Sequence, residues 1–244
     1  MNLLLDIGNT RIKWAYVESD IFISGQAITH KTSAFAKTIK QQWLALNMPD
    51  NLAICSVSAK HIEQQVITVA QQLWPDIKVI IAKSSAQTFS VINAYPQPEK
   101  LGIDRWLGLI AFQHYYPGHC GGIIDCGTAI TLDCINDNGQ HLGGLISPGV
   151  QLMKQALQHN TEALPLTTEH YSAALSNTTE AAIYSGTLYA AAGFIEKTIT
   201  DLGKGNTWIL TGGDAHLLAP YLKIKCILDT DFVLKGLSLY CSDE

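Results

Sequence analysis

Two hydrophobic runs along the chain end in the same polar signature. Leu3-Leu4-Leu5 precedes Asp6-Ile7-Gly8-Asn9-Thr10, and Gly122-Ile123-Ile124 precedes Asp125-Cys126-Gly127-Thr128-Ala129. Each run reads as a buried strand, and the glycine that follows permits a tight turn. The two signatures are about 120 residues apart, close to the span of one small domain. The pattern therefore predicts two related halves.

The spacing of apolar residues predicts a similar order of elements in both halves, namely three antiparallel strands followed by helices and strands. For the first half we expect strands at Asn2–Ile7, Ile12–Glu18, Ile21–Thr29, Leu52–Ser56 and Lys78–Ala82, and helices at Ala34–Leu46 and Lys60–Leu73. For the second half we expect strands at Gly122–Asp125, Ala129–Ile135, Gly139–Ile146 and Trp208–Thr211, and helices at Val150–His159, Thr179–Leu202 and Val233–Tyr240. A further helix is expected at Leu107–Tyr115. This order predicts an α/β protein of two ribonuclease-H-like domains, residues 1–115 and 116–244.

The residues that follow each first strand suit the binding of phosphate. The turn glycines let backbone amides face a ligand, Thr10 and Thr128 add hydroxyl donors, and Lys13 adds a positive charge. Asp6 and Asp125 stand among these donors, where a carboxylate would repel bare phosphate, so a bound cation is implied. We expect a nucleotide to lie between the two halves.

The signature has other possible interpretations. A single Asp-x-Gly-x-Thr could be plain turn chemistry, because all three residue types favour turns, but a second copy on a comparable strand argues against this. The sequence has no Gly-x4-Gly-Lys-Ser/Thr loop, no Gly-x-Gly-x-x-Gly after a strand and no His-Glu-x-x-His helix. The common nucleotide-binding and zinc-protease motifs are therefore unsupported.

Composition narrows the class of partner. Charged residues make up 15% of the chain, apolar residues 47%, and the formal net charge is −5, which argues against binding to nucleic acid or to an anionic membrane. Few charges with a high apolar fraction indicate that a second copy covers part of the surface. The six cysteines form no Cys-x-x-Cys pair, so we expect reduced thiols. Without a signal-peptide pattern or an apolar stretch of 18 residues, a cytoplasmic protein is expected.

Five segments, taken in order, resemble the type III pantothenate kinase family, a branch of the superfamily of actin, sugar kinases and heat-shock chaperones. They are Asp6-Ile-Gly-Asn-Thr-Arg-Ile-Lys13, Leu101-Gly-Ile-Asp-Arg105, Asp125-Cys-Gly-Thr-Ala-Ile-Thr-Leu-Asp133, Gly143-Gly-Leu-Ile-Ser-Pro-Gly149 and Leu210-Thr-Gly-Gly-Asp-Ala215. The resemblance covers nearly the whole chain. It implies ATP-dependent phosphorylation of pantothenate to 4'-phosphopantothenate, the first step of coenzyme A biosynthesis, in a cleft between two ribonuclease-H-like domains.

The resemblance also implies roles for particular residues. Asp104 would accept the proton of the substrate hydroxyl, and Asp125 would bind a monovalent cation, potassium or ammonium. ATP, with Mg²⁺, would be bound by Asp6, Ile7, Gly8, Asn9, Thr10, Arg11, Ile12, Lys13 and Thr128. Pantothenate would be bound by Tyr95, Gly102, Ile103, Asp104, Arg105 and Thr179.

The pair Asp104-Arg105 also has a chemical rationale of its own. A carboxylate that accepts a hydroxyl proton beside a guanidinium that binds an anionic oxygen makes a workable phosphoryl-acceptor site, and Gly102 would allow close approach. The alternative is a solvated pair at a helix start, where aspartate is favoured. The apolar, small-residue stretch Gly186–Ile195 and the resemblance predict a homodimer in which Thr179 of one subunit approaches Asp104 of the other.

Three other functions fit parts of the pattern. One is a kinase of the same superfamily that acts on another small hydroxylated substrate. Another is a nucleotide-binding regulatory protein without kinase turnover, which the presence of Asp104 and Arg105 beside intact phosphate loops disfavours. The last is a purely structural dimerisation protein, which would leave the donor-rich loops unexplained.

Overall fold

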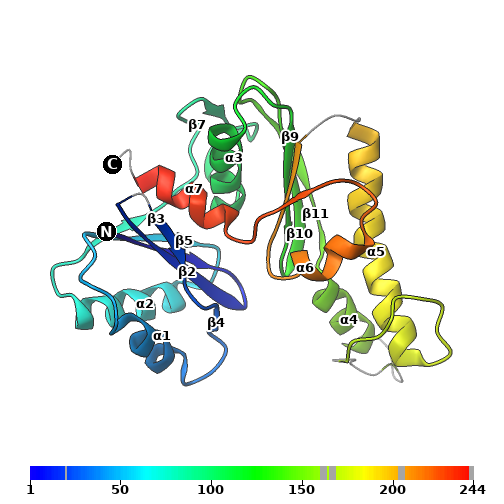
Figure 1. The fold of residues 1–244 in the computed structure, drawn as a ribbon, viewed down its shortest axis with the longest axis horizontal. Coiled ribbons are helices and arrows are strands. Elements are labelled where there is room, and N and C mark those ends of the chain that lie inside the picture. Colours follow the sequence, from blue (N-terminus) through cyan, green and yellow to red (C-terminus); the bar gives the residue numbers. More distant parts are fainter. Residues whose placement is uncertain (20, 160–163, 165–168, 203–206, 242–244) are drawn as a thin grey trace. The chain divides into compact units, whose positions relative to one another are not determined.

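The computed structural model describes residues 1–19, 21–159, 164, 169–202 and 207–241, and contacts group them into two units (Figure 1). The first unit comprises Met1–Pro117, Asn138–Gln140 and the C-terminal segment from Asp231, and the second comprises Gly118–Asp137 and His141–Thr230. The domain limits 1–115 and 116–244 stay a prediction. By contacts, the C-terminal helix belongs with the first unit. Within the described residues no helix is both long and apolar enough to cross a membrane.

The first unit is built on a mixed sheet with the strand order β3-β2-β1-β5-β6. Its strands are β1 (Asn2–Ile7), β2 (Arg11–Glu18), β3 (Ile21–Ser24), β4 (Ile28–Thr29), β5 (Asn51–Ser56) and β6 (Lys78–Ile81), with a separate hairpin of β7 (Gln87–Thr88) and β8 (Val91–Ile92). Its helices are α1 (Phe35–Trp43), α2 (Lys60–Leu73), the 3₁₀ turn η1 (Pro98–Lys100), α3 (Ile103–Tyr115) and α7 (Phe232–Cys241). The strands β1, β2 and β3 form an antiparallel meander, and β5 and β6 join it in parallel.

The strand β1 is buried on both faces of this sheet, as its successive apolar residues predict. Leu3 and Leu5 pack in one core with α1 and α2. Leu4 points to the opposite face, since side chains alternate along a strand, and is also fully buried. The helix α7 contacts β1 and β5 and packs against α3. A Cβ atom at Gly236 would lie 2.1 Å from the carbonyl oxygen of Leu107, so the glycine allows these two helices to approach closely.

The second unit repeats the topology with the strand order β11-β10-β9-β12-β13. Its elements are β9 (Gly121–Cys126), β10 (Ala129–Ile135), β11 (His141–Pro148), α4 (Val150–His159), α5 (Thr179–Leu202), β12 (Thr207–Thr211), α6 (Ala215–Leu218), the 3₁₀ turn η2 (Ala219–Tyr221) and β13 (Ile227–Leu228). Ile124, Leu132 and Leu210 of the sheet pack in one core with Leu188 and Ile195 of α5. The repeated strand order confirms the prediction of two ribonuclease-H-like domains.

The observed elements differ from the predicted ones mainly at their ends. The helix α3 begins four residues earlier than expected, because the carbonyl of Gly102 already accepts a hydrogen bond from the backbone N–H of Trp106 at 3.0 Å. The predicted third strand is divided into β3 and β4 around Gly25, whose N–H donates to the carbonyl of Trp14 at 2.8 Å. The short hairpin β7–β8 was not predicted, because strands of two residues have no readable alternation.

Candidate active site

The turn between β1 and β2 is braced by hydrogen bonds to its backbone. The N–H of Gly8 donates to the carbonyl of Arg11 at 3.0 Å, and the Nε2 of His30 lies 2.8 Å from the carbonyl oxygen of Gly8. The Oγ1 of Thr29 donates to the carbonyl of Thr10 at 3.3 Å. The segment around β4 thus fixes the shape of the predicted phosphate loop. The sequence reasoning missed His30, because a single histidine after a strand carries no motif.

Some side chains of this loop are buried in the core, and others are exposed and could contact a ligand. Ile7 and Ile12 are fully buried and hold the two strand ends in the core. Asn9 and Arg11 are exposed, and Thr10 is half-buried. The two isoleucines can therefore serve a nucleotide only through their backbone, whereas the polar residues can offer side chains as well.

Asp6 lies at the end of β1, opposite Lys13 on β2 and beside Cys55 on β5. The residue keeps some exposed surface, but its carboxyl group is enclosed by protein. Burial raises the pKa of Asp6 to about 6, although Lys13 acts in the opposite direction. The nearby carboxylate of Asp104 raises this pKa further, so the two acids are close enough to interact. A cation bound beside Asp6 would favour its ionised form.

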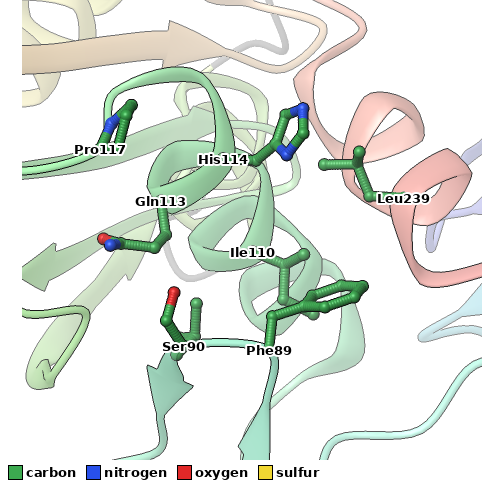
Figure 2. Close-up of a pocket in the computed structure, with 8 residues that line it drawn as sticks. Phe89, Ser90, Ile110, Gln113, His114, Pro117 and Leu239 are labelled. Carbon is green, nitrogen blue, oxygen red and sulfur yellow. The ribbon is translucent and has the colours of Figure 1, made fainter. Parts of the chain in front are cut away.

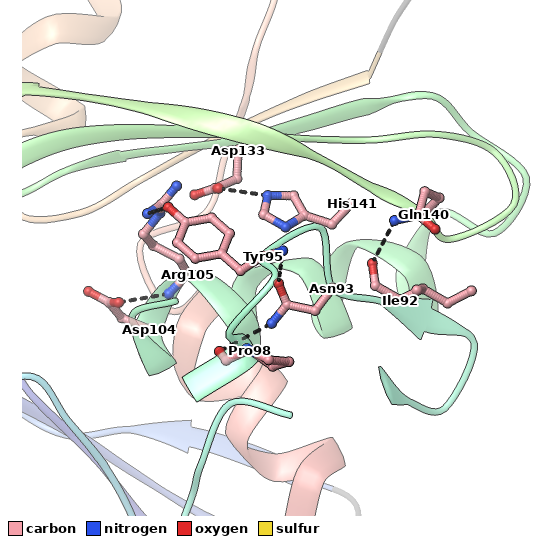
Figure 3. A network of polar contacts seen from close by, with 9 residues as sticks. All are labelled: Ile92, Asn93, Tyr95, Pro98, Asp104, Arg105, Asp133, Gln140 and His141. Carbon is pink, nitrogen blue, oxygen red and sulfur yellow. Dashed lines mark hydrogen bonds and ion pairs between the residues drawn. The ribbon is translucent and has the colours of Figure 1, made fainter. Parts of the chain in front are cut away.

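The predicted acceptor segment forms the first turn of α3 (Figure 3). Arg105 is only 9% exposed, and its NH1 donates to the Oη of Tyr95 at 3.0 Å, with the guanidinium carbon 5.7 Å from the centre of the tyrosine ring. The Oδ1 of Asp104 accepts a hydrogen bond from the backbone N–H of Arg105 at 2.8 Å. A Cβ atom at Gly102 would lie 2.6 Å from this Oδ1, so the glycine leaves room for the carboxylate. The burial of Arg105 does not fit a solvated pair at a helix start.

Asn93 holds the loop that carries Tyr95 (Figure 3). Its Oδ1 accepts a hydrogen bond from the backbone N–H of Tyr95 at 2.9 Å, and its Nδ2 donates to the carbonyls of Ser85 at 3.0 Å and Pro98 at 3.4 Å. One side chain thus connects three points of the loop before α3. No motif in the sequence predicts this role, since a lone asparagine in a proline-rich loop is ordinary turn composition.

Asp125 is the last residue but one of β9, the strand that corresponds to β1 in the shared sheet order. Its register partners are Thr131 on β10 and Thr211 on β12, whereas Asp6 faces a lysine. The Oγ1 of Thr211 is buried and has no hydrogen-bond partner among the described residues. A Cβ atom at Gly212, whose φ is +99°, would lie 2.4 Å from the Oδ1 of Asp125. A carboxylate beside hydroxyl oxygens, without a lysine, is a donor set that suits a hard cation.

The second turn is also shaped by close backbone contacts. The N–H of Gly127 donates to the carbonyl of Ala129 at 3.0 Å, and the N–H of Gly149 donates to the carbonyl of Thr128 at 2.9 Å. A Cβ atom at Gly149 would lie 2.2 Å from the carbonyl oxygen of Gly127, so only glycine fits there. The side chain of Thr128 is exposed at the tip of this turn.

The predicted site residues thus form one group in each unit. In the first unit the loop from Asp6 to Lys13 and the group of Tyr95, Gly102, Ile103, Asp104 and Arg105 are linked by the interaction of Asp6 with Asp104. In the second unit Asp125 and Thr128 share one turn. Thr179 is the exposed first residue of α5, and its proximity to the other residues stays a prediction. No cluster of three or more His, Cys, Asp or Glu side chains able to hold a metal ion occurs in the described part of the chain.

The repeated sheet, with an aspartate one residue before the end of each first strand and a glycine just after it, defines a protein of two ribonuclease-H-like domains. Solved structures agree with this class. An activator of 2-hydroxyisocaproyl-CoA dehydratase from Clostridium difficile superposes with a TM-score of 0.56 at 12% identity, over 99% of this chain and 94% of that one. A conserved Campylobacter jejuni protein, named for the Baf family of transcriptional activators, superposes with a TM-score of 0.61 at 23% identity, over 99% of this chain and 98% of that one. At these identities the likeness shows the fold alone.

The chain belongs to the type III pantothenate kinase family, whose sequence profile matches residues 2–201. A type III pantothenate kinase of Nitrosococcus oceani is 37% identical over 255 residues, covering 100% of this chain and 94% of the relative. One of Burkholderia lata is 33% identical over 261 residues, covering 99% and 95%. The predicted resemblance is confirmed.

Proposed function

We propose that the protein transfers the γ-phosphoryl group of ATP to the primary hydroxyl of pantothenate, forming 4'-phosphopantothenate at the start of coenzyme A biosynthesis. The observation that carries the proposal is the linked group of Asp104, Arg105 and Tyr95 next to Asp6 of the phosphate loop, in a chain of this family. We also propose that it acts in the cytoplasm, where both substrates are available, without nucleic acid or membrane as a partner.

In this proposal Asp104 accepts the proton of the attacking hydroxyl. Arg105 binds the carboxylate of pantothenate, and the hydroxyl of Tyr95 orients its guanidinium. Phosphoryl transfer needs in-line positioning and charge stabilisation more than covalent chemistry, so positioning by these residues is sufficient. General-base help of this kind contributes roughly 10²–10⁴-fold.

In this proposal the first phosphate loop binds ATP. Backbone amides of the turn after Ile7 and the ammonium group of Lys13 bind phosphate oxygens, and Asp6 is placed to hold the accompanying cation. Mg²⁺ bound with ATP neutralises charge on the phosphate oxygens. The enclosed carboxyl of Asp6, with Lys13 opposite, fits such a cation better than bare phosphate.

We infer that a monovalent cation, potassium or ammonium, binds at Asp125. The carboxylate ends its strand among donors that also suit phosphate, and no lysine is its register partner. The buried hydroxyl of Thr211, which has no hydrogen-bond partner among the described residues, would be a second oxygen ligand. The fit of this donor set to a cation supports the inference.

The active unit in this proposal is a homodimer. On α5, Thr179, Ala182, Gly186, Ala190 and Gly193 are all exposed and follow one another at three- or four-residue spacing, so they share one face of the helix. Neither Gly186 nor Gly193 has a neighbouring atom within 4 Å of a Cβ built there, among the described residues. A face of small residues lets a second helix approach closely, and Thr179 would then lie beside the partner subunit.

The test is a phosphorylation assay of purified protein with ATP and a panel of small hydroxy acids, with and without potassium, read by mass spectrometry. We expect a phosphorylated product from pantothenate and none from an analogue whose primary hydroxyl is replaced by hydrogen. Phosphorylation of a different acceptor would point to a sister kinase. Hydrolysis of ATP at the same rate without any acceptor, with no phosphorylated product, would favour the nucleotide-binding regulatory protein instead.

A further inference from the structure

A cavity of about 420 Å³ lies in the first unit between the C-terminal half of α3, the β7–β8 hairpin and α7 (Figure 2). Its volume is in the range of sites that bind small molecules. Ile110 of α3 and Leu239 of α7 contribute apolar surface, and Phe89 and His114 contribute aromatic rings. The described residues that line it include no Lys, Arg, Asp or Glu. An uncharged ligand therefore suits it, whereas ATP and pantothenate, both anionic, do not.

A polar group in the wall of this cavity lacks a partner. The carboxamide of Gln113 lines the cavity, and its Oε1 is buried without a hydrogen bond to any described residue. A buried acceptor without a donor is unfavourable, so a ligand that offers an N–H or O–H would be stabilised there. The terminal torsion of glutamine is soft, which allows the oxygen to turn towards such a donor.

The rim of the cavity has an unusual backbone. Phe89 has a φ of +51° and a side chain that is 47% exposed. This conformation is strained for a bulky residue, and such strain gathers at ligand clamps. With this backbone conformation the exposed ring of Phe89 lies beside Ile110 among the residues that line the cavity (Figure 2).

We propose that this cavity binds a small, uncharged aromatic molecule that carries one hydrogen-bond donor. The ring lies against Phe89, Ile110 and Leu239, and the donor bonds to the Oε1 of Gln113. Gln113 is nine residues after Asp104 on the same helix, roughly 13 Å along its axis, so the ligand does not occupy the place of the substrates.

The test uses the fluorinated probe 5-fluoroindole, observed by ¹⁹F NMR with the full-length protein in the absence of ATP and pantothenate. Its matched control is 5-fluorobenzofuran, which has the same shape but an oxygen in place of the N–H donor. We expect the indole to bind at least about tenfold more tightly than the benzofuran, because only the indole can donate to Gln113. Equal binding of the two probes, or no binding of either at millimolar concentration, would overturn the proposal.

Three variants locate the site. Gln113→Leu should remove the preference for indole and leave the binding of benzofuran unchanged. Ser90→Trp, at an exposed lining position, should fill the cavity and abolish the binding of both probes. Gln97→Leu, at an exposed position outside the cavity, should change nothing. Undiminished indole binding by a Ser90→Trp protein with a normal circular dichroism spectrum would place the ligand elsewhere and overturn the proposal, whatever the kinase assay shows.

Discussion

The guanidinium of Arg105 donates a hydrogen bond to the hydroxyl of Tyr95 over 3.0 Å and lies over the ring of the same tyrosine, 5.7 Å from its centre. Arg105 is buried, and a buried cation is costly unless it is hydrogen-bonded. Tyr95 therefore keeps the arginine in place before any substrate arrives. In the proposed function, the tyrosine hydroxyl would therefore be a positioning group for the arginine that binds the substrate's anion.

Tyr95→Phe should weaken the use of pantothenate while preserving the ring beneath the guanidinium. A hydrogen bond to a charged group contributes about 1.5–3 kcal/mol, so we expect KM for pantothenate to rise by roughly tenfold or more with a smaller change in kcat. Steady-state kinetics measure both constants. Tyr115→Phe, at an exposed tyrosine at the end of α3, the helix that carries Arg105, is the matched control and should leave KM unchanged. An unaltered KM in Tyr95→Phe would remove the tyrosine from the substrate site.

Asp104→Asn keeps the shape of the carboxylate and removes its basicity. We expect kcat to fall by at least about a hundredfold, with little change in ATP binding, because general-base catalysis is lost while the phosphate loop is intact. Glu99→Gln, at an exposed position in the turn before α3, makes the same chemical change outside the proposed site. The kcat of this variant should be close to that of the wild type. A near-normal kcat in Asp104→Asn would require another base.

The longer elements of the fold could be predicted from the sequence because their apolar residues have a clear period. The ends of β1, β10, α2, α4 and α5 agree with the predicted ranges, since apolar spacing and turn residues coincide there. The first turn of α3, Ile103 to Trp106, lies outside the predicted helix, because the apolar period that predicts the helix begins at Leu107. The hairpin around Phe89 was missed as well, because its turn contains neither glycine nor asparagine.

Only the site residues that belong to sequence motifs could be predicted. Asp6, Asp104 and Arg105 stand in recognisable segments, and the structure places them on β1 and at the start of α3, with the Asp104 carboxylate near enough to raise the pKa of Asp6. His30 and Asn93 support these segments through hydrogen bonds to backbone atoms. Such contacts depend on which loops lie next to each other in the fold, and no local sequence pattern predicts this.

The cation proposal predicts that activity rises with potassium or ammonium and responds little to sodium. Asp125→Ala should abolish this dependence and most of the activity, because the charged ligand is lost. Thr211→Val keeps the shape and removes one oxygen, so the potassium concentration for half-maximal activation should rise several-fold while kcat at saturation is retained. The control is Thr187→Val, which removes a buried threonine hydroxyl on α5. Full activity without any monovalent metal or ammonium would rule out the site.

The raised pKa of Asp6 predicts that the difference in stability between the wild type and Asp6→Asn depends on pH. A carboxyl whose pKa is 3.8 when unfolded and about 6 when folded favours the native state in its protonated form. Its contribution is fully present below pH 3.8 and is lost as pH rises through 6. At pH 8, Asp6→Asn should therefore raise the free energy of unfolding of the ligand-free protein by up to about 3 kcal/mol. Near pH 3.5 the same substitution should raise it by little.

Urea unfolding followed by tryptophan fluorescence measures this difference, with the exposed Asp76→Asn as control. An equal effect at both pH values would contradict the prediction.

The homodimer proposal predicts that two inactive proteins restore each other's activity. Thr179 stands on the same exposed face of α5 as Gly186 and Gly193, so pairing of this helix about a two-fold axis would present Thr179 to the partner subunit. Such an interface should bury more than about 1,000 Å² and leave little free monomer, which light scattering can measure.

Asp104→Asn protein mixed with Thr179→Ala protein should regain activity after subunit exchange, because each heterodimer contains one intact shared site. Statistical exchange gives about half heterodimers, each with one of its two sites intact, so the expected recovery is roughly a quarter of wild-type activity. Mixing Asp104→Asn with the double variant Asp104→Asn/Thr179→Ala is the matched control and should recover nothing, since no combination supplies an intact Asp104. An active monomer at assay concentration would refute the dimer. Verified exchange without recovery would place Thr179 in the site of its own subunit, because both sites of every heterodimer would then carry a substitution.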